Sequence, residues 1–147
     1  MFATDPETGI AERGRIDWLN SRALDLKTTA GDSSEADFAI QAFRFGYDVQ
    51  LAWYEHLYYL ITGEPLPYLF VVVEAHPPYL TNVHRLGDDE LLMARRRARE
   101  ARERYARAIE TGEWPGYKTR SGGPIGILQA PVWNVNQYID EFEGATA

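Results

Sequence analysis

Asp17, Asp25 and Lys27 are the residues of this 147-residue chain whose types and spacing most clearly suggest chemistry. Carboxylates are among the oxygen ligands that Mg²⁺ prefers, and one or two of them suffice when waters and a substrate's phosphate oxygens complete the coordination. A lysine two residues from Asp25 could orient or deprotonate an attacking water, or stabilise negative charge that develops on a phosphate. Hydrolysis of a phosphodiester needs these parts: a metal, a positioned water and a cation.

A β-hairpin over residues 11–29 is expected to position the three residues, because apolar and polar residues alternate along it. A three-residue turn at 20–22 would set Asp17 opposite Asp25 and Arg15 opposite Lys27. Two opposed carboxylates repel, and a divalent cation would relieve the repulsion, with the Leu26 backbone carbonyl as a further oxygen ligand. The opposite face, which we expect to pack on the core, holds Ile16, Trp18, Leu24 and Leu26.

An exposed polar face on an ordinary hairpin is the alternative interpretation of these residues, since an Asp-x-Lys triplet is common. The second aspartate on the opposed strand, with apolar residues behind both strands, is what favours a metal site.

The remaining pattern predicts a mixed α/β domain in which helices flank a sheet. Periodicity, caps and turn residues define the further elements, and residues 1–9 look irregular. We expect a helix capped by Ser33 or Ser34 and running to about residue 45, and a helix over 47–61 after Gly46. A central strand over 68–74, buried on both sides, should be followed by a short strand over 80–86 and a helix over 88–111. The tail from Ile125 should hold a short strand and a last helix from Val135.

The composition limits the possible functions. The formal net charge is −7, which counts against an unspecific nucleic-acid binder, while the absence of cysteine excludes disulfides, thiolate metal sites and cysteine nucleophiles. The N-terminus has no signal-peptide pattern, and with the lack of cysteine this suggests the cytoplasm. The arginines between 95 and 107 alternate with glutamates, so a solvated face is favoured over a phosphate track, and the three histidines have no ligand spacing.

Several motifs, in order, resemble the PD-(D/E)XK nucleases, and more closely their RecE-like (exodeoxyribonuclease VIII) branch of phages and prophages. Gly-Arg-Ile-Asp ending at Asp17 and Leu-Asp-Leu-Lys ending at Lys27 resemble the short signature of that superfamily. Gln50 and Tyr54, four residues apart on one helix face, resemble the Gln-x-x-x-Tyr helix of the branch. The strand over 68–74, the Pro-Pro-Tyr that follows at 77–79 and the turns at 114–117 and 131–133 extend the likeness from about Gly14 to Trp133.

The resemblance implies a restriction-endonuclease-like core, with a mixed β-sheet made of the hairpin and the central buried strand. It also implies that Asp17 and Asp25 bind Mg²⁺ or Mn²⁺, that Lys27 is the catalytic lysine, and that Gln50 and Tyr54 support the DNA end or the metal site. The implied activity is 5′→3′ exonuclease digestion of double-stranded DNA in recombination. The implied assembly is a ring-like homo-oligomer, with a single-strand annealing protein as a partner.

Members of that branch carry a longer segment before the hairpin, with an additional acidic residue near the metal. We therefore expect residues 1–142 to be a single domain without the N-terminal part of the family domain, and residues 143–147 to be a flexible tail. Glu12 could replace the acidic residue. The alternative function is a catalytically impaired nuclease-fold module that binds DNA ends or a partner protein.

Overall fold

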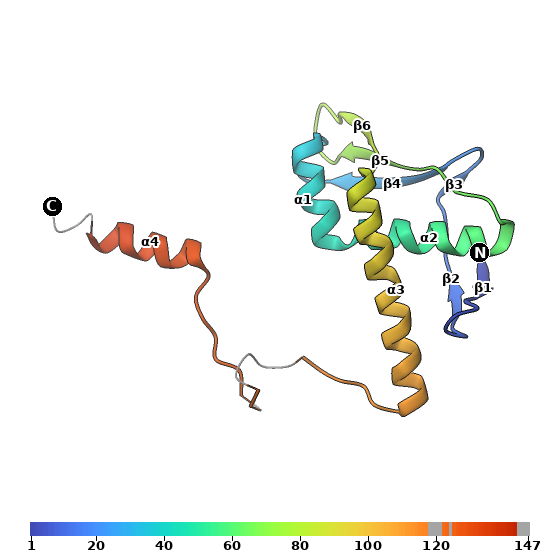
Figure 1. Cartoon of the computed structure of the whole chain (residues 1–147). Coiled ribbons are helices and arrows are strands. Elements are labelled where there is room, and N and C mark those ends of the chain that lie inside the picture. The colour runs from blue at the N-terminus through green and yellow to red at the C-terminus, as the bar shows by residue number, and fades with distance from the viewer. Residues whose placement is uncertain (118–121, 124, 144–147) are drawn as a thin grey trace. The chain divides into compact units, whose positions relative to one another are not determined.

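The computed structural model of the chain describes residues 1–117, 122–123 and 125–143 (Figure 1). The chain divides into two compact units, Met1–Glu113 and Trp114–Ala147. All five side chains of the predicted site lie in the first unit, and the helix of the second unit is α4, Val132–Glu143. The single domain over 1–142 stays a prediction, and the predicted tail lies outside the described residues after Glu143.

A four-stranded mixed sheet forms the centre of the first unit, with its strands in the order β3-β4-β5-β6 (Figure 1). The central strands β4 and β5 run parallel, and both edge strands are antiparallel to their neighbours. This arrangement confirms the predicted mixed sheet and the bounds of its central strand. The strands are β3, Trp18–Leu19; β4, Ala23–Thr29; β5, Tyr68–Glu74; and β6, Thr81–His84.

Three helices belong to the first unit: α1, Glu35–Phe45; α2, Tyr47–Thr62; and α3, Asp88–Thr111. Ser34 caps α1 through its side chain, which accepts a hydrogen bond from the backbone N–H of Asp37. Gly46 then adopts a left-handed conformation, φ 73°, and separates α1 from α2 as predicted.

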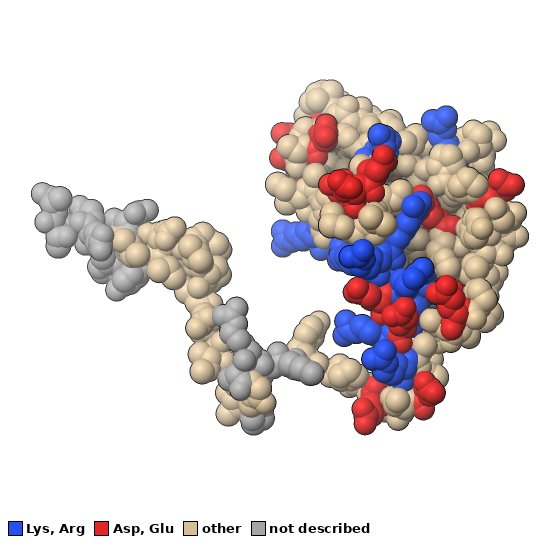
Figure 2. Space-filling model, in the orientation of Figure 1, with Lys and Arg blue, Asp and Glu red and all other residues tan. Residues whose placement is uncertain are grey.

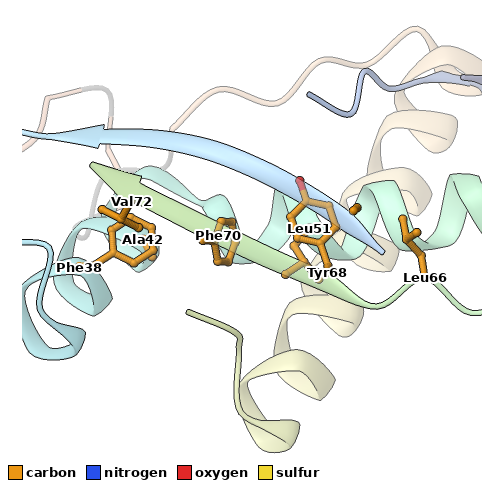
Figure 3. Packing of buried hydrophobic residues seen from close by; sticks show 8 residues of the cluster. Phe38, Ala42, Leu51, Leu66, Tyr68, Phe70 and Val72 are labelled. Atoms are coloured by element: carbon orange, nitrogen blue, oxygen red, sulfur yellow. The ribbon is translucent and has the colours of Figure 1, made fainter. Parts of the chain in front are cut away.

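The main core lies between one face of the sheet and the two helices α1 and α2, and Figure 3 shows its side chains gathered beside β5. α3 packs on α2 through a smaller cluster in which Ala52 contacts Ala94 and Ala98. The buried residues of the main core are Ala23, Phe38, Ala42, Leu51, Leu66, Tyr68, Phe70 and Val72.

The prediction of which face of the hairpin packs on the core is wrong for most of its residues. Asp25 is 3% exposed and lies on the core side of β4, whereas Leu26 is 57% and Trp18 50% exposed. The cause is the crossover: parallel β4 and β5 need a long connection, and its helices α1 and α2 cover the face that carries Asp25. Ile16 does pack against the core, and β5 is fully buried on one face only.

The predicted hairpin is also shorter than expected, although its register is confirmed. Trp18 pairs with Leu24, and Leu19 with Ala23. The ladder ends there, so the predicted pairing of Arg15 with Lys27 is wrong.

The residues before this ladder belong to a separate sheet. Residues 11–13 form β2, Ala11–Arg13, which pairs with β1, Phe2–Thr4, in a two-stranded sheet. Residues 1–9 are therefore not irregular throughout. In the described part of the second unit no strand follows Ile125, and the last helix begins at Val132.

Candidate active site

The ammonium group of Lys27 is held by three neighbours on the core side of β4. Its Nζ lies 2.7 Å from Oδ2 of Asp25, which precedes it by two residues and shares its face of the strand. The same Nζ donates a hydrogen bond of 3.0 Å to Oε1 of Gln50 on α2. It also lies 4.2 Å from the ring centroid of Tyr47, at the start of α2. These contacts fix the cation beside a buried carboxylate.

Asp17 lies in a bend just before β3 and remains exposed to solvent. Its Oδ2 accepts a hydrogen bond of 3.0 Å from the backbone N–H of Leu26. This bond, and the pairing of Trp18 with Leu24 next to it, set Asp17 beside Asp25. The two carboxylates therefore meet as predicted, although the regular ladder has already ended.

The surroundings of Asp25 disfavour the ionised form of its carboxyl, even with Lys27 beside it. Burial raises the pKa of the Asp25 carboxyl, and the neighbouring Asp17 adds to the rise, while Lys27 opposes it. The buried Oδ2 of Asp25 is paired with the Lys27 ammonium at 2.7 Å. An exposed and a buried carboxylate next to each other are a donor set that suits a hard divalent cation.

α2 supplies the two remaining predicted residues. Gln50 accepts the hydrogen bond from Lys27, and Tyr54 lies one turn further along, with its ring centroid 6.4 Å from that of Tyr68. Gly14 leaves room for the ring of Tyr54, because a Cβ at position 14 would lie 2.9 Å from Cδ1 of that ring. The fold thus brings Gln50 into direct contact with the strand motif, whereas Tyr54 reaches it through Tyr68.

Tyr68 and Tyr47 are site residues that the sequence reasoning missed. Tyr68 is buried, and among the described residues its hydroxyl has no hydrogen-bond partner. Burial raises the pKa of this hydroxyl well above its ordinary value, and the nearby Asp25, Tyr54 and Asp17 raise it further. Pairing the strand over 68–74 in parallel with the Asp25 strand would have placed Tyr68 here, but the sequence carried no indication of that register.

A second polar cluster is made of other residues than the predicted site. Ligand atoms of Asp5, Glu12 and His56 lie within 4.8 Å of one another, although the histidines have no ligand spacing in the sequence. Arg102 on α3 supplies a cation to this cluster, with its Nε 3.4 Å from Oε1 of Glu12. Burial raises the pKa of Glu12, and Arg102 opposes the rise. Glu12 therefore interacts with Arg102, His56 and Asp5, which weakens its case as a replacement ligand beside Asp25.

The arginines of α3 are interleaved with acidic residues on the face shown in Figure 2. Among the described residues, three of them form ion pairs with acidic residues of other elements, which agrees with a role in packing rather than a phosphate track. The pairs are Arg95 with Glu55, Arg97 with Asp48 and Arg102 with Glu12.

Residues 1–122 match the family described as "PDDEXK-like domain of unknown function (DUF3799)". The chain belongs to this PDDEXK-like family. Its membership confirms the PD-(D/E)XK superfamily that the motifs indicated, while the narrower RecE-like assignment stays a prediction. No curated protein matches the chain.

The PDDEXK-like chain also has a neighbour among solved structures, the crystal structure of a "Putative exonuclease" from Eubacterium rectale. The two share 19% sequence identity with a TM-score of 0.59, and the match covers 98% of this chain and 56% of that chain. This chain therefore spans little more than half the length of its neighbour. The similarity confirms the restriction-endonuclease-like fold. In the described part of the PDDEXK-like chain, no helix has the length and apolar character needed to cross a membrane.

Proposed function

We propose that this PDDEXK-like chain is a metal-dependent nuclease that hydrolyses phosphodiester bonds of double-stranded DNA from an end. The single observation that carries the proposal is the buried Asp25 beside Asp17, with the Lys27 ammonium 2.7 Å away. A buried carboxylate with a second carboxylate next to it is unfavourable for folding alone, because both burial and like charge disfavour its ionised form. Such an arrangement is common where function requires it.

Asp17, Asp25 and the backbone carbonyl of Leu26 are the groups that would hold Mg²⁺ or Mn²⁺. When bound, a divalent cation supplies Lewis-acid polarisation of a phosphate oxygen and neutralises its charge. The hydrogen bond from Leu26 N–H keeps one oxygen of Asp17 directed at β4. The exposure of Asp17 leaves that edge of the site open to a phosphate backbone.

Lys27 would act mainly as a fixed positive charge. Its Nζ lies against two oxygen acceptors, from Asp25 and Gln50, and over the ring of Tyr47, and all three contacts suit a cation. They therefore support stabilisation of negative charge on the phosphate more than removal of a proton from water. Gln50 would position this cation, and Tyr54 would support the site or the DNA end from the next turn of α2.

The finer features of the proposal come from the RecE-like resemblance, except for the cytoplasm, which the sequence suggested. They are digestion from the 5′ end, a role in recombination in the cytoplasm with a single-strand annealing protein, and a ring-like homo-oligomer. Since this chain spans about half of its neighbour, these features belong to the proposal for the whole protein.

The experiment is release of nucleotides from linear duplex DNA in Mg²⁺ or Mn²⁺, with wild type, Asp25→Asn and Lys27→Ala. We expect activity that EDTA abolishes and that each variant lowers by about a hundredfold or more. Asp88→Asn is the matched control, because Asp88 is 97% exposed and far along the chain from the site. Equal activity of wild type and a folded Asp25→Asn protein would contradict the mechanism.

A nuclease-fold module that no longer cleaves is the second candidate. The observation in its favour is that only two carboxylates meet at Lys27 among the described residues, while Glu12 is engaged with Arg102. This candidate predicts that the protein binds DNA ends or a partner protein without metal uptake. Calorimetric titration with Mn²⁺, run beside a DNA-end binding assay, separates the two.

A further inference from the structure

Tyr68 lies on the same side of the sheet as the candidate site. In the parallel ladder Tyr68 pairs with Ala23, and Phe70 pairs with Asp25. The side chains of Tyr68 and Asp25 therefore lie on the same face of the sheet, on neighbouring strands and two residues apart along the ladder. The Tyr68 side chain is 6% exposed. In Figure 3 its hydroxyl end points toward β4, the strand that carries Asp25.

The hydroxyl of Tyr68 is not needed for packing. Its ring already packs against Phe70, with 5.6 Å between ring centroids, and against Tyr54 at 6.4 Å. A phenylalanine would make the same ring contacts. In the part of the chain that the structure describes, the buried hydroxyl has no hydrogen-bond partner, which is unfavourable and rare enough in folded proteins to require an explanation.

The Asp25 carboxylate is an acceptor in the same site. Its buried Oδ2 lies 2.7 Å from the Lys27 ammonium, and a carboxylate can accept more than one hydrogen bond. A tyrosine hydroxyl next to an ionised carboxylate is the donor, because the carboxylate can only accept.

We propose that Tyr68 is a positioning residue of the metal site: its hydroxyl donates to the Asp25 carboxylate and holds it in the orientation that binds a divalent cation. The inference rests on the proposed function, because it assigns Tyr68 to the same site. Partners that orient ligating carboxylates in this way contribute strongly to metal affinity.

The test compares Tyr68→Phe with wild type in two measurements made on the metal-free protein and on its titration with Mn²⁺. We expect the thermal midpoint of the metal-free variant to equal or exceed that of wild type, because the variant removes an unsatisfied buried hydroxyl. We expect the dissociation constant for Mn²⁺, measured by calorimetry, to rise about tenfold. Tyr59→Phe is the matched control, because Tyr59 lies on the exposed side of α2 and should change neither quantity.

The outcomes separate this inference from the proposed function. A lower midpoint for Tyr68→Phe, or failure to fold, with or without a change in Mn²⁺ affinity, shows a structural role and overturns the inference. An Mn²⁺ site that Asp25→Asn abolishes and Tyr68→Phe leaves unchanged overturns the inference alone. Absence of any Mn²⁺ binding by wild type overturns both. In the nuclease assay the inference predicts a higher Mn²⁺ requirement, with kcat at saturating Mn²⁺ largely retained.

Discussion

Lys27 on β4 donates a 3.0 Å hydrogen bond to Gln50 on α2. This contact joins the strand motif to the helix motif, which lie 23 residues apart in the chain. The crossover from β4 to β5 brings α2 back over the core side of β4. This places the helix motif next to the strand motif. Gln50 therefore belongs to the site through Lys27.

Removing the Gln50 acceptor should lower nuclease activity by about ten- to a hundredfold, the usual effect of losing a group that orients an active-site side chain. Gln50→Leu would leave the Lys27 ammonium with Asp25 and Tyr47 alone, and so less well positioned. Initial rates on linear duplex DNA measure the effect. Gln50→Glu keeps an oxygen acceptor and should retain more activity; a Gln50→Leu protein as active as wild type would exclude the positioning role.

Gly14→Ala should destabilise the protein by about 1–3 kcal/mol, the usual range for overpacking a tight contact. The new Cβ would lie 2.9 Å from Cδ1 of Tyr54 and 3.0 Å from Cδ2 of Leu57. Urea denaturation measures the change. Gly116→Ala is the control, because a Cβ there meets nothing within 4 Å, and a similar loss in both variants would show that crowding is not the cause.

Glu74→Gln should destabilise the protein at neutral pH and much less in acid. Hydrogen bonds from the Ser33 backbone N–H and hydroxyl hold the pKa of Glu74 below its ordinary value of 4.5, while burial opposes them. Since the folded-state pKa is the lower one, the stabilisation is complete above the unfolded pKa and is lost as pH falls through the folded pKa. Denaturation of both proteins at about pH 7 and pH 3 should show the difference shrinking in acid; a difference that grows in acid would show the opposite sign.

Arg102→Leu should cost about 3–5 kcal/mol, because it leaves the Glu12 carboxylate buried without its cation. The side chains of Arg102 and Glu12 are 7% and 0% exposed, respectively. The double variant Arg102→Leu with Glu12→Leu removes both charges and should recover much of the loss. Chemical denaturation of the two variants is the measurement, and an additive loss in the double variant would show that the pair is not coupled.

Local patterns predicted most of the elements and the pairing of β3 with β4 well. The strand at Tyr68–Glu74 and the helix at Asp88–Thr111 have the predicted bounds, because an uninterrupted β-branched run and a regular apolar stripe are unambiguous signals. The pairing of Trp18 with Leu24 followed from the turn length.

Long-range features were not available from the same patterns. Which face of β4 is covered depends on the crossover through α1 and α2, and the alternation at Leu24 and Leu26 gave the opposite answer. The place of Tyr68 depends on the parallel register of β5, and the cluster around Glu12 depends on the docking of α3. Each of these joins segments that only the folded chain brings together.

The location of the bound metal is the central claim, and one measurement tests it directly. Crystals grown in Mn²⁺ would give an anomalous difference map in which the metal appears at its ligands without any assumption about activity. The account predicts a Mn²⁺ peak between the carboxylates of Asp17 and Asp25, beside Lys27. A peak confined to the cluster of Asp5, Glu12 and His56, or no peak at all in crystals saturated with Mn²⁺, would contradict it.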